Sequence, residues 1–129
     1  MSDVKSIPNK DKEKVLPFII AVDFDGTLVE NKFPDIGEIR TEMWNAIAKA
    51  KEDGAKVILY TCRTGELLDD AAAFCHSNGM SFDAINDNID EVKAVGWYAR
   101  KVFANVYLDD RACVLSRSSG FVPVKLEVD

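Results

Sequence analysis

The sequence has 129 residues, of which 47% are hydrophobic and 29% are charged, and its formal net charge is -6. This length and composition fit one globular domain and exclude a largely disordered chain. The acidic excess argues against sequence-independent binding to nucleic acid phosphates, but it is compatible with a small phosphorylated ligand.

The sequence also predicts a location in the cell. The apolar run at residues 18–22 is far too short to span a bilayer. The first 14 residues are polar and lysine-rich, with no hydrophobic region of a signal peptide after them. The three cysteines form no CxxC pair, which favours reduced thiols. We therefore expect a cytoplasmic protein with a flexible leader at residues 1–16 and one domain at residues 17–129.

Hydrophobic patterning predicts strands and helices in alternation. Strands are predicted at residues 18–22, 56–61, 82–85 and 104–108, with helices at 36–50, 66–78 and 91–98. A further strand is predicted at residues 121–128, where Pro123 suits an edge position. This alternation indicates βαβ units, so we expect an α/β fold with a Rossmann-like, doubly wound and mostly parallel sheet.

Acidic residues follow two of the predicted strands directly. Asp23 and Asp25 come after the first strand, and Asp109 and Asp110 end the fourth. The carboxyl ends of parallel strands meet at one sheet edge, where ligands bind in open α/β sheets. Like charges placed so closely require a cation or a shared proton, and magnesium suits carboxylate oxygens and phosphate substrates. The sequence therefore predicts a Mg²⁺ site at this edge.

These residues also carry a family resemblance. The segment from Asp23 to Leu28, DFDGTL, resembles motif I (DxDGT) of the haloacid dehalogenase (HAD) superfamily. Thr61 resembles motif II, Lys101 the lysine of motif III, and Asp109–Asp110 the acidic pair of motif IV. The order of the motifs covers residues 18 to about 112. The short connections between them leave no room for a cap domain, so the resemblance implies a capless HAD-like core.

The resemblance implies a Mg²⁺-dependent phosphatase of the HAD type. Asp23 would form an aspartyl-phosphate intermediate, and Asp25 would act as general acid and base. Mg²⁺ would bind the Asp23 carboxylate, the Asp25 backbone carbonyl and a carboxylate of the Asp109–Asp110 pair. The Thr61 hydroxyl and the Lys101 ammonium would hold the phosphoryl oxygens.

Two assignments near these motifs stay open, and a third residue has a structural interpretation. Lys93 also precedes the fourth strand, and is an alternative to Lys101 as the phosphate-binding lysine. Arg63 follows Thr61 by two residues, and is interpreted either as a substrate-binding guanidinium or as a surface residue paired with Glu66. Cys62 is interpreted as a small packing residue.

Other functions use the same residues. A phosphotransferase would share the first half-reaction, and a HAD-fold protein could bind a phospholigand or a partner without turnover. A signalling receiver domain is disfavoured, because its acidic pair comes first and its phosphorylated aspartate later. The expected partner is a phosphorylated small molecule rather than a macromolecule. A second subunit in a homo-oligomer would close the open, capless site.

Overall fold

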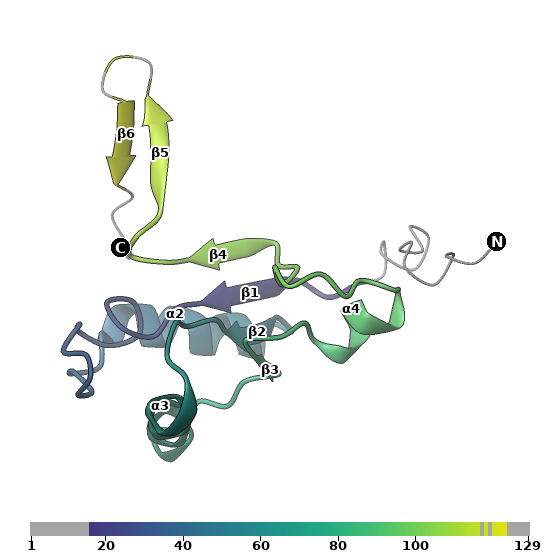
Figure 1. The fold of residues 1–129 in the computed structure, drawn as a ribbon. Coiled ribbons are helices and arrows are strands. Elements are labelled where there is room, and N and C mark those ends of the chain that lie inside the picture. The colour runs from purple at the N-terminus through teal and green to yellow at the C-terminus, as the bar shows by residue number, and fades with distance from the viewer. Residues whose placement is uncertain (1–15, 117, 119, 124–129) are drawn as a thin grey trace.

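The chain folds around one parallel β-sheet, which confirms the predicted α/β class. The computed structural model describes residues 16–116, 118 and 120–123. Four strands pair in parallel in the order β3-β2-β1-β4 (Figure 1). Their bounds are Ile19–Val22 for β1, Lys56–Leu59 for β2, Ala84–Ile85 for β3 and Val106–Leu108 for β4.

Helices cover both faces of the sheet because β1 and β2 are apolar on both sides. Ile20 and Val22 of β1 face a core that includes residues of α2 (Thr41–Glu52) and α3 (Gly65–Ser77). Ile19 and Ala21 face a second, smaller core that includes Ile89 and Val92 of α4 (Asp90–Ala94). The alternation follows from the two-residue period of a strand. Figure 1 shows α4 near the ends at which the strands begin, so it leaves their carboxyl ends open.

The first helix begins later than its hydrophobic spacing predicts. Residues 29–40 form a loop, closed by the N–H of Glu30 bonded to the carbonyl of Glu38 at 2.8 Å. The predicted helical face included Ile36 and Ile39, which pack against the first core from this loop. An isolated antiparallel bridge between Val29 and Ile39 competes there with helical hydrogen bonding. The prediction of a helix from residue 36 is therefore wrong, although the burial of its apolar residues is not.

The C-terminal part forms a hairpin outside the main sheet. Strands β5 (Cys113–Ser116) and β6 (Gly120–Pro123) pair with each other antiparallel, and Figure 1 shows them projecting away from β4. Only residues 121–123 of the predicted final strand are described, and residues 124–128 lie outside the described part of the chain. The predicted leader lies outside it as well, apart from Leu16.

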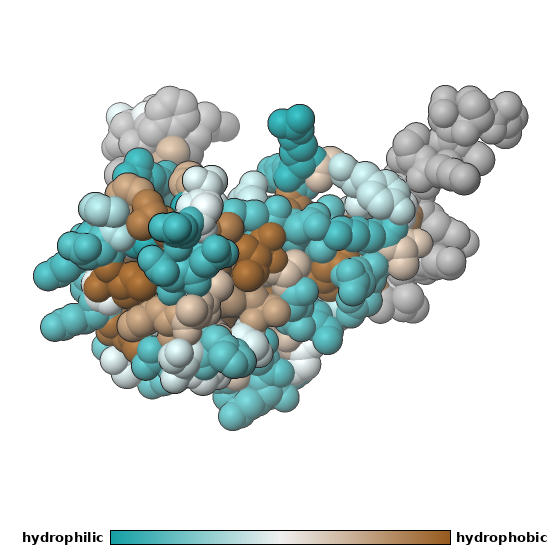
Figure 2. All heavy atoms as spheres, turned by 60° about the horizontal axis from the view of Figure 1, so that its bottom comes forward, coloured by the Kyte–Doolittle hydropathy of each residue, from teal (hydrophilic) through white to brown (hydrophobic). Residues whose placement is uncertain are grey.

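Hydrophilic side chains cover most of the face on which α3 comes forward. Figure 2 shows hydrophobic surface there in separate patches between hydrophilic ones. Within residues 16–116, 118 and 120–123, no helix has the length and apolar character needed to cross a membrane.

Candidate functional site

The parallel register of β1 and β4 brings three aspartates together. Val22 pairs with Leu108, and the N–H of Asp23 continues the ladder to the Leu108 carbonyl at 2.9 Å. Asp23 and the Asp109–Asp110 pair therefore leave adjacent strand ends side by side. Carboxylate oxygens of Asp23, Asp109 and Asp110 all lie within 4.8 Å of one another.

This environment makes a negative charge on Asp23 unfavourable. Burial is the main cause that raises the pKa of Asp23 to about 7, and the negative charges of Asp109, Asp110 and Asp25 raise it further. The N–H of Phe24, bonded to Asp23 Oδ1 at 2.8 Å, opposes this shift. A cation at the cluster would reverse the balance and favour the ionised group.

Asp110 and Gly26 show how closely the cluster is packed. Asp110 Oδ1 is buried and has no hydrogen-bond partner within the described residues. A buried carboxylate oxygen without a partner is costly, and a metal ion is one way to satisfy it. Gly26 has a φ of 81°, and a Cβ built on it would lie 2.1 Å from Asp110 Oδ2. The oxygen donors of the cluster therefore fit a hard divalent cation such as Mg²⁺.

The substitution Gly26→Ala tests this packing. We expect it to lower the free energy of unfolding by about 2–4 kcal/mol, because the new methyl group meets Asp110 and the positive φ disfavours alanine. Gly79→Ala is the matched control, since Gly79 has a similar φ of 87° but no atom within 4 Å of an added Cβ. Urea unfolding measures both. Equal losses in the two variants would show that the contact with Asp110 contributes nothing.

Asp25, the other aspartate of the predicted motif, turns away from this cluster toward Arg63. Arg63 Nε donates to Asp25 Oδ2 at 2.8 Å, and Nη2 donates to Oδ1 at 2.7 Å. The remaining guanidinium hydrogens go to the backbone carbonyls of Pro34, Asp35 and Leu67. These contacts use all five N–H donors of the arginine. Arg63 thus ties the Asp25 turn to the 29–40 loop and to the first turn of α3.

The position of Arg63 corrects the expectations for this segment. Its side chain is only 1% exposed, so the interpretation as a surface residue paired with Glu66 is wrong. With its donors occupied by the protein, Arg63 positions Asp25 in this structure and offers no hydrogen bond to a substrate. Cys62 is exposed, and it lines the pocket that lies over the acidic cluster. Its interpretation as a packing residue is therefore wrong too.

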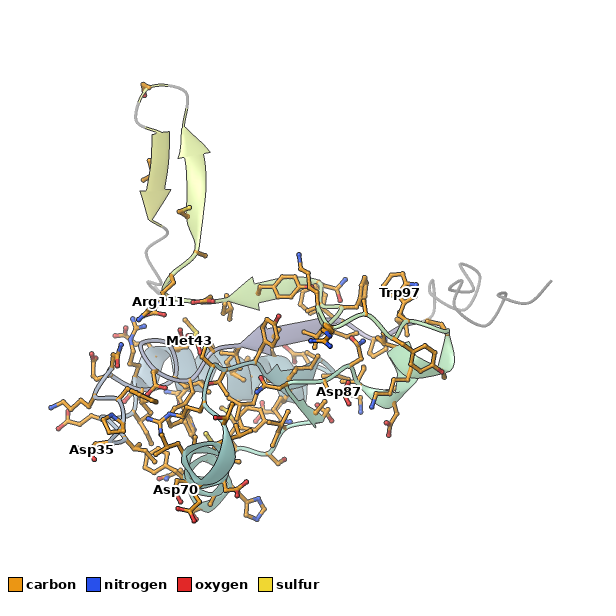
Figure 3. All side chains as sticks on the ribbon, viewed as in Figure 1. Asp35, Met43, Asp70, Asp87, Trp97 and Arg111 are labelled. Atoms are coloured by element: carbon orange, nitrogen blue, oxygen red, sulfur yellow. The ribbon has the colours of Figure 1, made fainter. Side chains whose placement is uncertain are left out.

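A pocket of about 600 Å³ lies over the cluster. Asp23, Asp25, Thr61 and Asp109 line it, together with residues that the sequence analysis did not single out: Asn31, Phe33, Tyr60 and Arg111. Figure 3 shows Arg111 between the end of β4 and the hairpin. Arg111 lies two residues after Asp109 and supplies a positive charge at the pocket. Its proximity to the acidic pair was the only signal in the sequence.

Neither candidate lysine lines this pocket. The Lys101 ammonium lies over the Tyr107 ring, 5.4 Å from its centroid, beside a second pocket that Trp97 also lines. Figure 3 shows Trp97 near α4, at the other end of the molecule from Arg111. Lys93 is bonded to Asp87 at 2.6 Å. The structure therefore does not bring Lys101 or Lys93 to the acidic cluster, because both precede β4 and start from the opposite end of the sheet.

Comparisons with known proteins place the chain in a family. No protein-family model matches the sequence, and no curated protein matches it. Among solved structures, the chain is similar to a conserved protein from Bacteroides thetaiotaomicron, with 37% sequence identity and a TM-score of 0.67. The match covers 75% of this chain and 78% of that one. The chain therefore belongs to the same family as this conserved Bacteroides thetaiotaomicron protein.

Proposed function

We propose that the protein is a Mg²⁺-dependent phosphohydrolase in which Asp23 attacks phosphorus. The main support is the cluster of Asp23, Asp109 and Asp110 at adjacent strand ends, whose carboxylate oxygens lie within 4.8 Å of one another. Thr61 and Arg111 line the same pocket and supply a hydroxyl and a positive charge for phosphoryl oxygens. The order of the HAD-like motifs adds independent support from the sequence.

Asp23, Asp109 and Asp110 would hold the metal ion, and the Asp25 backbone carbonyl stays a predicted ligand. When bound, Mg²⁺ supplies positive charge that offsets the repulsion between these carboxylates and a phosphate group. The fit rests on the oxygen-only donor set and on the buried, unpartnered Asp110 Oδ1.

The remaining chemistry falls to side chains of the chain. A carboxylate oxygen of Asp23 forms a bond to phosphorus while the bond from phosphorus to the ester oxygen breaks. Asp25 gives a proton to that leaving oxygen. Asp25 then takes a proton from a water molecule, whose oxygen attacks phosphorus and releases phosphate and the free Asp23 carboxylate. The reaction consumes the phosphomonoester and one water molecule, and it releases the alcohol and phosphate.

One observation favours a second candidate, a site that binds a phosphorylated ligand without turnover. Both oxygens of Asp25 accept hydrogen bonds from Arg63, so the protein already occupies the carboxylate that would act as general acid and base. A protonated Asp25 would lose part of this bonding. In the hydrolase, Asp25 must therefore exchange a proton while Arg63 stays in place or moves aside.

The direct test follows phosphate release from a panel of phosphorylated metabolites, with Mg²⁺ and with a chelator. We expect Mg²⁺-dependent release, and Asp110→Asn should raise the Mg²⁺ concentration for half-maximal rate by roughly tenfold or more, because a ligand charge is lost. Asp53→Asn, at the exposed end of α2, is the matched control and should change nothing.

The outcomes separate the two candidates. Mg²⁺ binding to the folded protein without phosphate release from any substrate would favour the binding site without turnover. Release at full rate in the presence of the chelator would contradict the metal-dependent reaction.

A further inference from the structure

Two tyrosines lie side by side on one face of the sheet, and Tyr60 borders the acidic cluster. Tyr60 follows β2 and donates its N–H to the Val22 carbonyl at 2.9 Å, which places it next to Asp23. Tyr107 of β4 pairs with Ala21, two residues before Asp23. Their ring centroids are 6.3 Å apart. The two rings therefore form one aromatic surface, which we call the tyrosine wall. Tyr60 lines the pocket over the acidic cluster, and Tyr107 lines the second pocket.

The Tyr107 ring of the tyrosine wall is held in place by hydrogen bonds, and both rings are only partly covered. The Tyr107 hydroxyl donates to the Val102 carbonyl at 2.5 Å and accepts the N–H of Ala104 at 3.2 Å. These bonds fix the ring and satisfy its polar end within the protein. Tyr60 and Tyr107 are nevertheless 36% and 39% exposed. A fixed ring with accessible surface is suited to stacking, because little conformational entropy is lost when a ligand binds.

Together with Tyr60, an aromatic ring from the 29–40 loop lines the pocket over the acidic cluster. Phe33 is 55% exposed, and its ring lies over the buried Arg63 guanidinium at 5.1 Å. The pocket is large enough for a small organic molecule, whereas a phosphate group alone would leave most of it empty. A phosphoryl group at the acidic cluster would therefore have the rings of Phe33 and Tyr60 beside it in the same pocket.

We propose that this site takes phosphomonoesters that carry a planar aromatic ring, such as nucleoside monophosphates, and that the ring stacks on the tyrosine wall. This inference rests on the proposed function. The positive charge of Arg111 at the pocket complements the ligand's phosphate. The Lys101 ammonium over Tyr107 disfavours a second protein copy as the occupant, because lysine is depleted at the centres of protein interfaces. The net charge of -6 favours a free mononucleotide over a nucleic acid strand.

A matched pair of ligands tests the inference. Adenosine 5′-monophosphate and ribose 5-phosphate share the sugar and phosphate but differ in the base. We expect kcat/KM to be at least about tenfold higher for the nucleotide, because stacking of a base on an aromatic side chain contributes at this level.

Tyr60→Leu should lower this ratio of kcat/KM values by roughly tenfold, whereas Tyr60→Phe should keep it. Phe18→Leu is the control, since Phe18 is an exposed aromatic residue that directly precedes β1, at the opposite end of the sheet.

Calorimetric binding of both ligands to Asp23→Asn with Mg²⁺ gives the ratio of their affinities without turnover, and we expect tighter binding of the nucleotide. Equal affinities and equal rates would overturn ring recognition, even with phosphate release observed. Absent release together with tighter nucleotide binding would instead overturn the hydrolase and keep the ring site. Binding of a 5′-phosphorylated trinucleotide more than about tenfold tighter than the mononucleotide would overturn the assignment to a free small molecule.

Discussion

Replacing Asp23 with asparagine is expected to lower kcat by about 10⁴-fold or more, as loss of a catalytic nucleophile does in other enzymes. The amide cannot form the bond to phosphorus at a useful rate, and it removes one carboxylate from the metal cluster. Phosphate release with saturating Mg²⁺ measures this loss. Activity within tenfold of the unchanged protein would contradict the role of Asp23 and the reaction proposed here.

The same substitution is expected to stabilise the metal-free protein. The pKa of Asp23 is about 7 in the folded state, against 3.8 for an ordinary aspartate. Between these values the folded state holds a proton that the unfolded state has lost, so the free energy of unfolding falls as the pH rises. Well above pH 7 the Asp23 proton is lost in the folded state too, and the stability that protonation of Asp23 gave is lost completely. Asp23→Asn avoids the penalty, and should raise the free energy of unfolding by about 2–4 kcal/mol near pH 8.

Urea unfolding at several pH values, in a chelator, measures this effect. The advantage of Asp23→Asn should vanish near pH 4 and shrink when Mg²⁺ is added near pH 8, because the cation binds the original carboxylate more strongly. Asp53→Asn should show no such dependence. A stability difference that is the same at both pH values would contradict the raised pKa as its cause.

Replacing Arg63 with alanine is expected to lower the free energy of unfolding by about 3–5 kcal/mol. The variant leaves the Asp25 carboxylate, which is only 15% exposed, without its cationic partner. It also removes the donors to the carbonyls of Pro34, Asp35 and Leu67, so the 29–40 loop loses its attachment to α3. Arg63→Lys keeps the charge but not the two parallel bonds, and should recover only part of the loss.

Arg100→Ala is the control for this experiment. Arg100 is exposed, and its removal should change the free energy of unfolding by less than about 0.5 kcal/mol. The double variant Asp25→Asn/Arg63→Ala should be less destabilised than the sum of the single variants by roughly 1–3 kcal/mol, because the two side chains share their hydrogen bonds. Additive losses would show that the pair contributes nothing beyond its separate contacts.

The sequence predicts the fold and the acidic cluster well because both depend on local pattern. The apolar residues at 19–22 and 57–59 indicate strands buried on two faces, and the structure covers both faces. Asp23 and Asp109 directly follow strands, so parallel pairing is enough to bring them together. Asp23 and Asp109 are far apart in the sequence, but the pairing of β1 with β4 brings their strand ends together.

Side-chain direction could not be predicted in the same way. The bond between Arg63 and Asp25 spans 38 residues and depends on the path of the 29–40 loop, which hydrophobic spacing assigned to a helix. Tyr60 and Tyr107 belong to runs that predict buried strands, yet the short α4 leaves them partly exposed. Lys101 has a suitable position in the motif order, but its side chain lies over Tyr107 and not at the acidic cluster.

The hairpin described above gives the acidic pair an unusual position in the folded chain. Only Arg111 and Ala112 separate Asp110 from β5, and within the described residues β5 pairs with no strand other than β6. A two-stranded hairpin has little stability of its own, so it can open while the central sheet stays folded. Asp109 and Asp110 thus lie between the central sheet and a hairpin that can unfold separately from it. A ligand that joins them to Asp23 would protect the first amides of the hairpin from hydrogen exchange by fixing the base from which it extends.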